Sequence, residues 1–84
     1  MYEVYVEQAA ERDLKKLSAQ DFHRVIPRIK ELAENPRPAG CRKLVSSEND
    51  WRIRVGDYRI IYEIDDKAQA VRVMHVKRRH EAYR

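Results

Sequence analysis

The chain has 84 residues, of which 38% are charged and 43% are hydrophobic, with a formal net charge of +4 at pH 7. This length predicts one domain spanning residues 1–84. The apolar content of the sequence is too high for a disordered chain. No apolar run is long enough for a transmembrane helix, and the N-terminus has no signal-peptide core. The single cysteine excludes an internal disulfide, so we expect a cytoplasmic protein.

The first half of the chain predicts one strand followed by two helices. Residues 2–7 are rich in β-branched and aromatic side chains, which favours a strand. Residues 8–17 carry apolar residues at helical spacing, namely Ala10, Leu14 and Leu17. Residues 21–35 continue with a second apolar stripe, made of Phe22, Val25, Ile26, Ile29, Leu32 and Ala33.

The boundaries of the second helix follow from capping residues and prolines. Ser18 and Asp21 are both suitable caps for its first turn. Pro27 cannot donate the backbone hydrogen bond of a helix interior, so we expect an interruption or kink there. Further prolines and a glycine then indicate a loop at residues 34–43.

Residues 51–64 indicate a β-hairpin with Gly56 and Asp57 as its two-residue turn. This register places Arg54 opposite Arg59. Since successive residues alternate between the faces of a sheet, one face of the hairpin is apolar, with Trp51, Ile53, Val55, Tyr58, Ile60 and Tyr62. The other face carries Arg52, Arg54, Arg59 and Ile61, with Glu63 at its edge. A further strand follows at 70–76, and the chain closes with a basic segment at 77–84.

The arginines of the hairpin have two interpretations. Opposed like charges cost a few tenths to about 1 kcal/mol, so their concentration favours a face that binds a polyanion. Guanidinium groups suit this role because their planar forks match phosphate oxygens. The alternative is an ordinary solvated face, on which some arginines pair with carboxylates from elsewhere in the fold.

The order of these elements predicts an α+β fold. It consists of an N-terminal strand, two helices and then a three-stranded antiparallel meander. The helices are expected to pack on the apolar face of the hairpin. The arginine face would then be left uncovered by the chain itself.

Four segments resemble the RelE/ParE superfamily of toxin–antitoxin toxins, and its RelE-type branch above all: residues 31–38, 43–44, 51–65 and 76–84. The resemblance spans essentially the whole chain, and its specific part is 51–65 with the Gly-Asp-Tyr-Arg turn. It implies a ribosome-dependent endoribonuclease, or mRNA interferase. In this chemistry the ribose 2′-hydroxyl attacks the adjacent phosphorus, and neither a metal nor another cofactor is needed.

The resemblance also implies roles for residues at matching positions. Arg59, after Gly-Asp-Tyr, corresponds to a ligand of the phosphate and of the transition state. Arg52 and Arg54 correspond to alternating basic positions that bind RNA phosphate.

In the C-terminal segment, Arg79 matches the family's terminal arginine, with Arg78 or Lys77 as alternatives one or two positions earlier. Tyr83 matches the terminal tyrosine, which stacks on a base or assists proton transfer. All these tail residues belong to the expected catalytic or RNA-binding set.

The identity of the general base stays open. Well-studied RelE-type members carry lysine where this chain has Arg52 and Arg54, and an arginine does not release its proton. Five other residues are candidates for proton transfer: His80, His75, Tyr83, Lys77 and Glu63. Histidine has the suitable pKa, and His80 in the basic tail is favoured. His75 is interpreted instead as a core or partly buried strand residue.

The resemblance implies an acidic, RelB-like antitoxin as partner, together with the ribosomal A site and mRNA. Operator DNA would be bound only through the antitoxin, and no membrane is involved. Two alternatives share the fold: a ParE-like inhibitor of DNA gyrase, and an inactive toxin that acts mainly as an antitoxin-bound co-repressor. The arginines at the lysine positions keep the gyrase alternative open.

Overall fold

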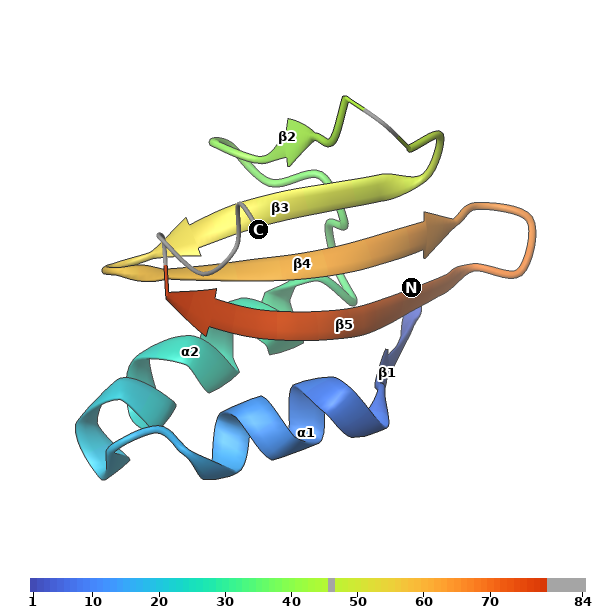
Figure 1. Cartoon of the computed structure of the whole chain (residues 1–84). Helices are drawn as coiled ribbons and strands as arrows, with labels where there is room; N and C mark the ends of the chain where they lie inside the picture. Colours follow the sequence, from blue (N-terminus) through green and yellow to red (C-terminus); the bar gives the residue numbers. More distant parts are fainter. Residues whose placement is uncertain (46, 79–84) are drawn as a thin grey trace.

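The structure is a computed structural model that describes residues 1–45 and 47–78. Its elements in chain order are β1 (Glu3–Val6), α1 (Gln8–Lys15), α2 (Ala19–Glu31), β2 (Arg42–Lys43), β3 (Asp50–Val55), β4 (Tyr58–Asp65) and β5 (Ala70–Arg78). Both helices lie on one side of the sheet (Figure 1). The predicted α+β class, with its N-terminal strand, two helices and final meander, is confirmed.

The sheet is mixed rather than purely antiparallel. Its strand order is β1-β5-β4-β3-β2, and β1 runs parallel to β5 while the other pairs are antiparallel. The two-residue strand β2 pairs with β3 at a place where the sequence predicted only a loop. Strand β4 is therefore the middle strand, with β3 and β5 on either side.

The predicted register of the β3–β4 hairpin is confirmed. Arg54 pairs with Arg59 and Arg52 pairs with Ile61, around a turn in which Gly56 has a φ of +59°. That positive φ is easily adopted by glycine and explains its place in the turn. We call the side of the sheet that carries these arginines the open face, because the helices pack on the other side.

The core lies between the helices and the sheet. It consists of apolar side chains from α1, α2 and the inner face of the sheet: Ala10, Leu14, Val25, Ile29, Leu32, Ile53, Val55, Ile60, Tyr62, Ile64, Val71, Val73 and Val76. Phe22, expected in the apolar stripe of α2, is 39% exposed. It lies in the first turn of the helix, outside the stretch 25–32 whose buried side chains face the sheet.

Helix α2 is continuous through Pro27, so the expected interruption there is wrong. Pro27 lies on the exposed side of the helix, where water can satisfy the carbonyl that a proline leaves without its donor. Ser18 caps the start of the helix, and its Oγ accepts a hydrogen bond from the Asp21 backbone N–H at 3.1 Å. Of the two capping candidates, Ser18 is the cap.

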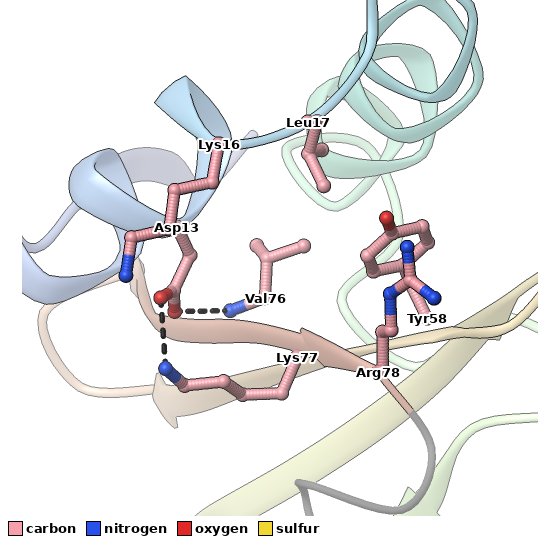
Figure 2. A pocket seen from close by; sticks show the side chains of 7 residues that line it. All are labelled: Asp13, Lys16, Leu17, Tyr58, Val76, Lys77 and Arg78. Carbon is pink, nitrogen blue, oxygen red and sulfur yellow. Dashed lines mark hydrogen bonds and ion pairs between the residues drawn. The ribbon is translucent and has the colours of Figure 1, made fainter.

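Helix α1 is joined to the sheet by a polar contact as well as by its apolar face. The side chain of Asp13 points from α1 to β5, where it binds the backbone of Val76 and the side chain of Lys77 (Figure 2). These bonds fix α1 along the part of β5 that extends beyond the short strand β1.

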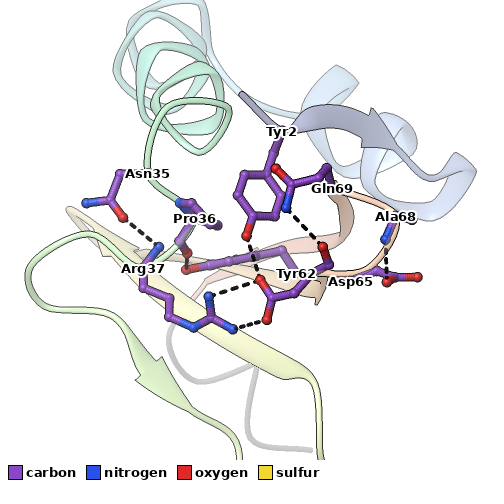
Figure 3. Close-up of polar contacts among 9 residues, drawn as sticks. Tyr2, Asn35, Pro36, Arg37, Tyr62, Asp65, Ala68 and Gln69 are labelled. Atoms are coloured by element: carbon purple, nitrogen blue, oxygen red, sulfur yellow. Dashed lines mark hydrogen bonds and ion pairs between the residues drawn. The ribbon is translucent and has the colours of Figure 1, made fainter.

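A buried tyrosine holds the loop after α2 against the sheet. The Tyr62 hydroxyl donates to the carbonyl oxygen of Pro36 at 2.7 Å (Figure 3). Burial raises the pKa of the Tyr62 phenol far above its usual value, so the group stays protonated and remains a donor.

A second cluster joins the same loop to the β4–β5 turn and to the N-terminus (Figure 3). The Arg37 guanidinium binds the Asp66 carboxylate at 2.9 Å, and the Tyr2 hydroxyl donates to the same carboxylate at 2.6 Å. The bonds from Arg37 and Tyr2 hold the pKa of Asp66 below its usual value. The Arg37 guanidinium also lies 5.1 Å from the centre of the Trp51 ring.

Replacing Tyr62 with phenylalanine keeps the buried ring and removes only its hydroxyl. We expect the free energy of unfolding to fall by about 1–3 kcal/mol, because the Pro36 carbonyl loses its donor inside the protein. Urea denaturation measures the change. Tyr5→Phe is the matched control, since the exposed Tyr5 should give a change within about 0.5 kcal/mol. Equal denaturation midpoints for the two variants would contradict this account.

Candidate active site

A β-bulge in β5 determines which side chains share the open face. The register between β4 and β5 shifts between Ile61 and Tyr62, and Met74 is the extra residue of β5. Regular alternation along β5 would turn His75 and Lys77 toward the helices. The bulge adds one residue and so reverses the alternation of side chains between the two faces of the sheet. Both side chains therefore lie on the open face.

A row of three cationic residues crosses this face near the β3–β4 turn. Arg54 on β3 pairs with Arg59 on β4, which in turn pairs with Lys77 on β5. Adjacent strands are about 4.8 Å apart, so the three side chains leave the sheet within about 10 Å of one another. We call these three residues the cation row. It presents several directional donors to an anion such as a phosphate group.

The expectation that the chain leaves the whole arginine face uncovered is wrong at Arg59. Its side chain is 1% exposed, whereas Arg54 is exposed and Arg52 is half-buried. Arg59 lies on β4, the middle strand of the sheet. A guanidinium in this less polar environment attracts a phosphate that reaches it more strongly than one in water does.

Carboxylates of the same chain hold two of the open-face cations. Glu63 binds Arg72 at 3.1 Å, and Asp13 binds Lys77 at 2.9 Å. Arg54, by contrast, forms no ion pair with any residue in 1–45 or 47–78. Pairing with carboxylates of the same chain, one of the two interpretations, therefore applies to part of the open face. Binding of a polyanion, the other interpretation, fits Arg54.

Asp13 is the group in this region that sequence reasoning missed. Its side chain is 6% exposed, and its Oδ2 accepts the Val76 N–H at 3.0 Å while its Oδ1 accepts a bond from the Lys77 ammonium. Burial alone would raise the pKa of Asp13, but the bonds from Lys77 and Val76 and the nearby charges hold it below its usual value. The carboxylate is therefore ionised at neutral pH.

A signal for Asp13 was present in the sequence. It lies at helical spacing with Ala10 and Leu14, on the stripe of α1 that faces the core. A carboxylate on a buried stripe needs a partner, because burying it without one is costly.

His75 also lies differently from its interpretation as a partly buried strand residue. Its side chain is 46% exposed, and its Nδ1 lies 3.7 Å from Oδ2 of Asp13. The interpretation was wrong because the bulge turns His75 away from the core. Asp13 thus lies beside two open-face residues of β5, His75 and Lys77.

Arg78 lies apart from the cation row. It pairs with Tyr58 across the strands, and its guanidinium lies 5.8 Å from the centre of the Tyr58 ring. Together with Lys16 and Leu17 it lines a pocket of about 130 Å³ between α1 and the sheet (Figure 2). The remaining tail candidates lie outside the described residues, namely Arg79, His80 and Tyr83.

Two further features concern the described part of the chain only. Within it, no three His, Cys, Asp or Glu side chains are placed to hold a metal ion together. Neither of its two helices has the length and apolar character needed to cross a membrane.

The fold agrees with comparisons to known proteins. Residues 4–83 match the model of the family described as ParE toxin of type II toxin–antitoxin system, parDE. The chain belongs to the RelE/ParE superfamily of toxins. It is also similar to Toxin RelE of Mycobacterium tuberculosis, with 32% identity over 84 residues that cover 99% of this chain and 87% of the relative.

Solved structures of RelE toxins have the same fold. This toxin matches the toxin–antitoxin complex RelBE2 from Mycobacterium tuberculosis with a TM-score of 0.81 and 29% identity, over 93% of this chain and 98% of that one. It matches the archaeal RelE–RelB complex from Pyrococcus horikoshii with a TM-score of 0.82 and 25% identity, over 93% and 94% of the two chains. The isolated E. coli RelE toxin, at 22% identity and a TM-score of 0.81 over 93% and 84% of the chains, supports the fold alone.

The contacts of Asp13 predict a pH-dependent contribution to stability. Asp13→Asn should lower the free energy of unfolding at pH 7 by about 1–3 kcal/mol, because the bond to the Lys77 ammonium is lost. The folded state holds the pKa of Asp13 below 3.8. The extra free energy of unfolding of the wild type over the variant is therefore present above about pH 4, and it is lost as pH falls through the folded-state pKa. Urea denaturation between pH 7 and pH 3 measures both effects.

Glu11→Gln is the control for this experiment. Glu11 pairs with Lys15 on the exposed side of α1, so its replacement should change stability by less than about 0.5 kcal/mol. A difference between wild type and Asp13→Asn that stays constant from pH 7 to pH 3 would show that the carboxylate charge plays no part.

Proposed function

We propose that this toxin is a ribosome-dependent endoribonuclease that cleaves mRNA in the cytoplasm and so inhibits translation. The 2′-hydroxyl of a ribose attacks the adjacent phosphorus, the bond to the 5′-oxygen breaks, and a 2′,3′-cyclic phosphate forms. The observation that carries the proposal is the cation row, which gathers Arg54, Arg59 and Lys77 on one face of the sheet. The similarity to toxins named RelE supports the same conclusion.

In this proposal Arg59 binds the scissile phosphate and the negative charge that develops on it. Preorganised donors are most effective where water is excluded, and Arg59 is 1% exposed. The RNA must displace the atoms that cover Arg59, so binding and rearrangement are coupled. Arg52 and Arg54 act by electrostatic attraction and position the RNA backbone, because an arginine does not serve as a base.

The sequence left Lys77 as a candidate both for RNA binding and for proton transfer, and in this proposal it has only the first role. Its ammonium donates to the Asp13 carboxylate, and in this proposal Lys77 acts as a cation and not as a base. Arg78, Arg79, His80 and Tyr83 stay candidates for phosphate binding and for protonation of the leaving oxygen.

We further propose that a RelB-like acidic antitoxin is the partner of this toxin. The similar structures from Pyrococcus horikoshii and Mycobacterium tuberculosis are complexes with an antitoxin. Acidic side chains placed on the open face would pair with the exposed Arg54 and compete with RNA for it. Operator DNA would then be reached only through the antitoxin.

Inhibition of DNA gyrase is the second candidate function. It is favoured by the match of residues 4–83 to a family described as ParE toxin. A gyrase inhibitor needs a binding surface but no acid or base, and arginines at the lysine positions are compatible with that. One fold supports both activities, so the site and not the fold must decide between them.

Cleavage of mRNA on programmed ribosomes tests the proposal. Wild-type toxin should cut the message in the A site, and primer extension maps the cuts. Arg59→Ala should slow cleavage by about 10²–10³-fold, because a preorganised donor to the transition state is lost. Arg12→Ala, which removes an exposed arginine from α1 on the helix side, should leave the rate unchanged.

Circular dichroism of Arg59→Ala must show a folded protein, since this side chain is buried. A message left intact by saturating wild-type toxin, together with inhibited supercoiling by gyrase, would replace the nuclease by the second candidate function.

A further inference from the structure

The proposed reaction needs a base for the 2′-hydroxyl, and the geometry of the open face narrows the choice. Of the five candidates, Lys77 is held as an ammonium by Asp13, and Glu63 is paired with Arg72. His75 is the described candidate that combines an exposed side chain with a suitable residue type.

The register places His75 next to the phosphate-binding position. His75 pairs with Ile61, and Arg59 lies two residues from Ile61 on the same face of β4. Such diagonal neighbours in a sheet are about 7–8 Å apart. This separation is short enough for one nucleotide to contact both Arg59 and His75.

We propose that His75 is the general base of the cleavage reaction and that Asp13 is its positioning residue. The proposal rests on the endoribonuclease function proposed above. Asp13 Oδ2 lies 3.7 Å from His75 Nδ1, on the side of β5 where α1 takes the place of a strand. A carboxylate next to one ring nitrogen orients the imidazole and leaves Nε2 for the substrate.

The step balances as a proton transfer coupled to substitution at phosphorus. Nε2 of His75 takes the proton of the 2′-hydroxyl, and the 2′-oxygen forms a bond to phosphorus. The bond from phosphorus to the 5′-oxygen breaks, and the leaving oxygen takes a proton from a separate acid. Arg59 binds the non-bridging oxygens, so base and cation act on the two sides of one phosphodiester.

The charges around His75 come from three elements. Asp13 on α1 is negatively charged, while Lys77 on β5 and Arg59 on β4 are positively charged. Glu63, the other diagonal neighbour on β4, is neutralised by its ion pair with a strand neighbour. The bulge at Met74 is needed for this environment, because regular alternation would turn His75 toward the helices. Bulges often direct side chains at active sites in this way.

Single-turnover cleavage on preassembled, programmed ribosomes between pH 5.5 and 8.5 tests the assignment. For the wild type, the rate should fall about ten-fold per pH unit at the acidic end, where a histidine base becomes protonated. His75→Ala should lose about 10²–10⁴ in rate and lose this acidic limb. Added imidazole should restore part of the rate, because the exposed position admits a small base. His23→Ala, the control, removes an exposed histidine from α2 and should keep both rate and profile.

Asp13→Asn separates positioning from a purely structural role. The variant should lower kcat more than it changes KM, retain an acidic limb, and gain nothing from imidazole, because its own base is still present. Urea denaturation of the variant shows whether the protein is folded at the assay temperature.

The possible results separate the role of His75 from the nuclease function. A wild type that cuts and a His75→Ala variant that cuts with the same rate and profile would overturn the role of His75 and leave the nuclease standing. Loss of activity that imidazole does not restore, with the acidic limb retained, would also overturn it. A wild type that leaves the message intact would overturn the nuclease and this assignment together.

Discussion

The carboxylate of Asp13 lies at the point where β1 ends and β5 continues, and the arrangement of the open face depends on it. Strand β1 pairs with β5 only from Glu3 to Val6, which leaves the later backbone of β5 without a neighbouring strand on this side. An unpaired N–H at the edge of a packed sheet is costly. The Val76 N–H binds Asp13 instead, and the same carboxylate holds the Lys77 ammonium. One side chain of α1 thus replaces a strand and anchors a residue of the candidate site.

The bulge in β5 has the complementary effect. It lets the first half of β5 place Val71 and Val73 in the core, and lets the second half place Val76 there while turning Lys77 outward. Without the phase change, a lysine would lie among apolar side chains and the cation row would have only its two arginines. The bulge and Asp13 together define the β5 side of the site, whereas the β3–β4 hairpin supplies its arginines.

The features that could be predicted from the sequence are those that depend on interactions between residues close together in the chain. The hairpin register depends on a two-residue turn and on local alternation, so Arg54 and Arg59 could be paired from the sequence alone. The bulge had a signal that was not used: the buried valines of β5 change from odd positions, 71 and 73, to an even one, 76. The parallel pairing of β1 joins distant segments and left no local pattern. Strand alternation could show which face Arg59 lies on, but not that its side chain is buried, because burial depends on the whole folded chain.

Positive charge alone does not distinguish the candidate functions of this toxin. Arginines attract ribosomal RNA, messenger RNA, DNA or an acidic antitoxin by the same force, and contacts to a phosphate backbone carry little sequence information. What distinguishes a nuclease from an inhibitor that only binds is a proton acceptor beside the phosphate site. In the described part of the chain, the exposed histidine next to Asp13 has that position, on the same face as Arg59 and one strand away from it. The proposed cleavage needs a proton acceptor and a cation on one face, whereas inhibition or co-repression by binding alone needs only the cations.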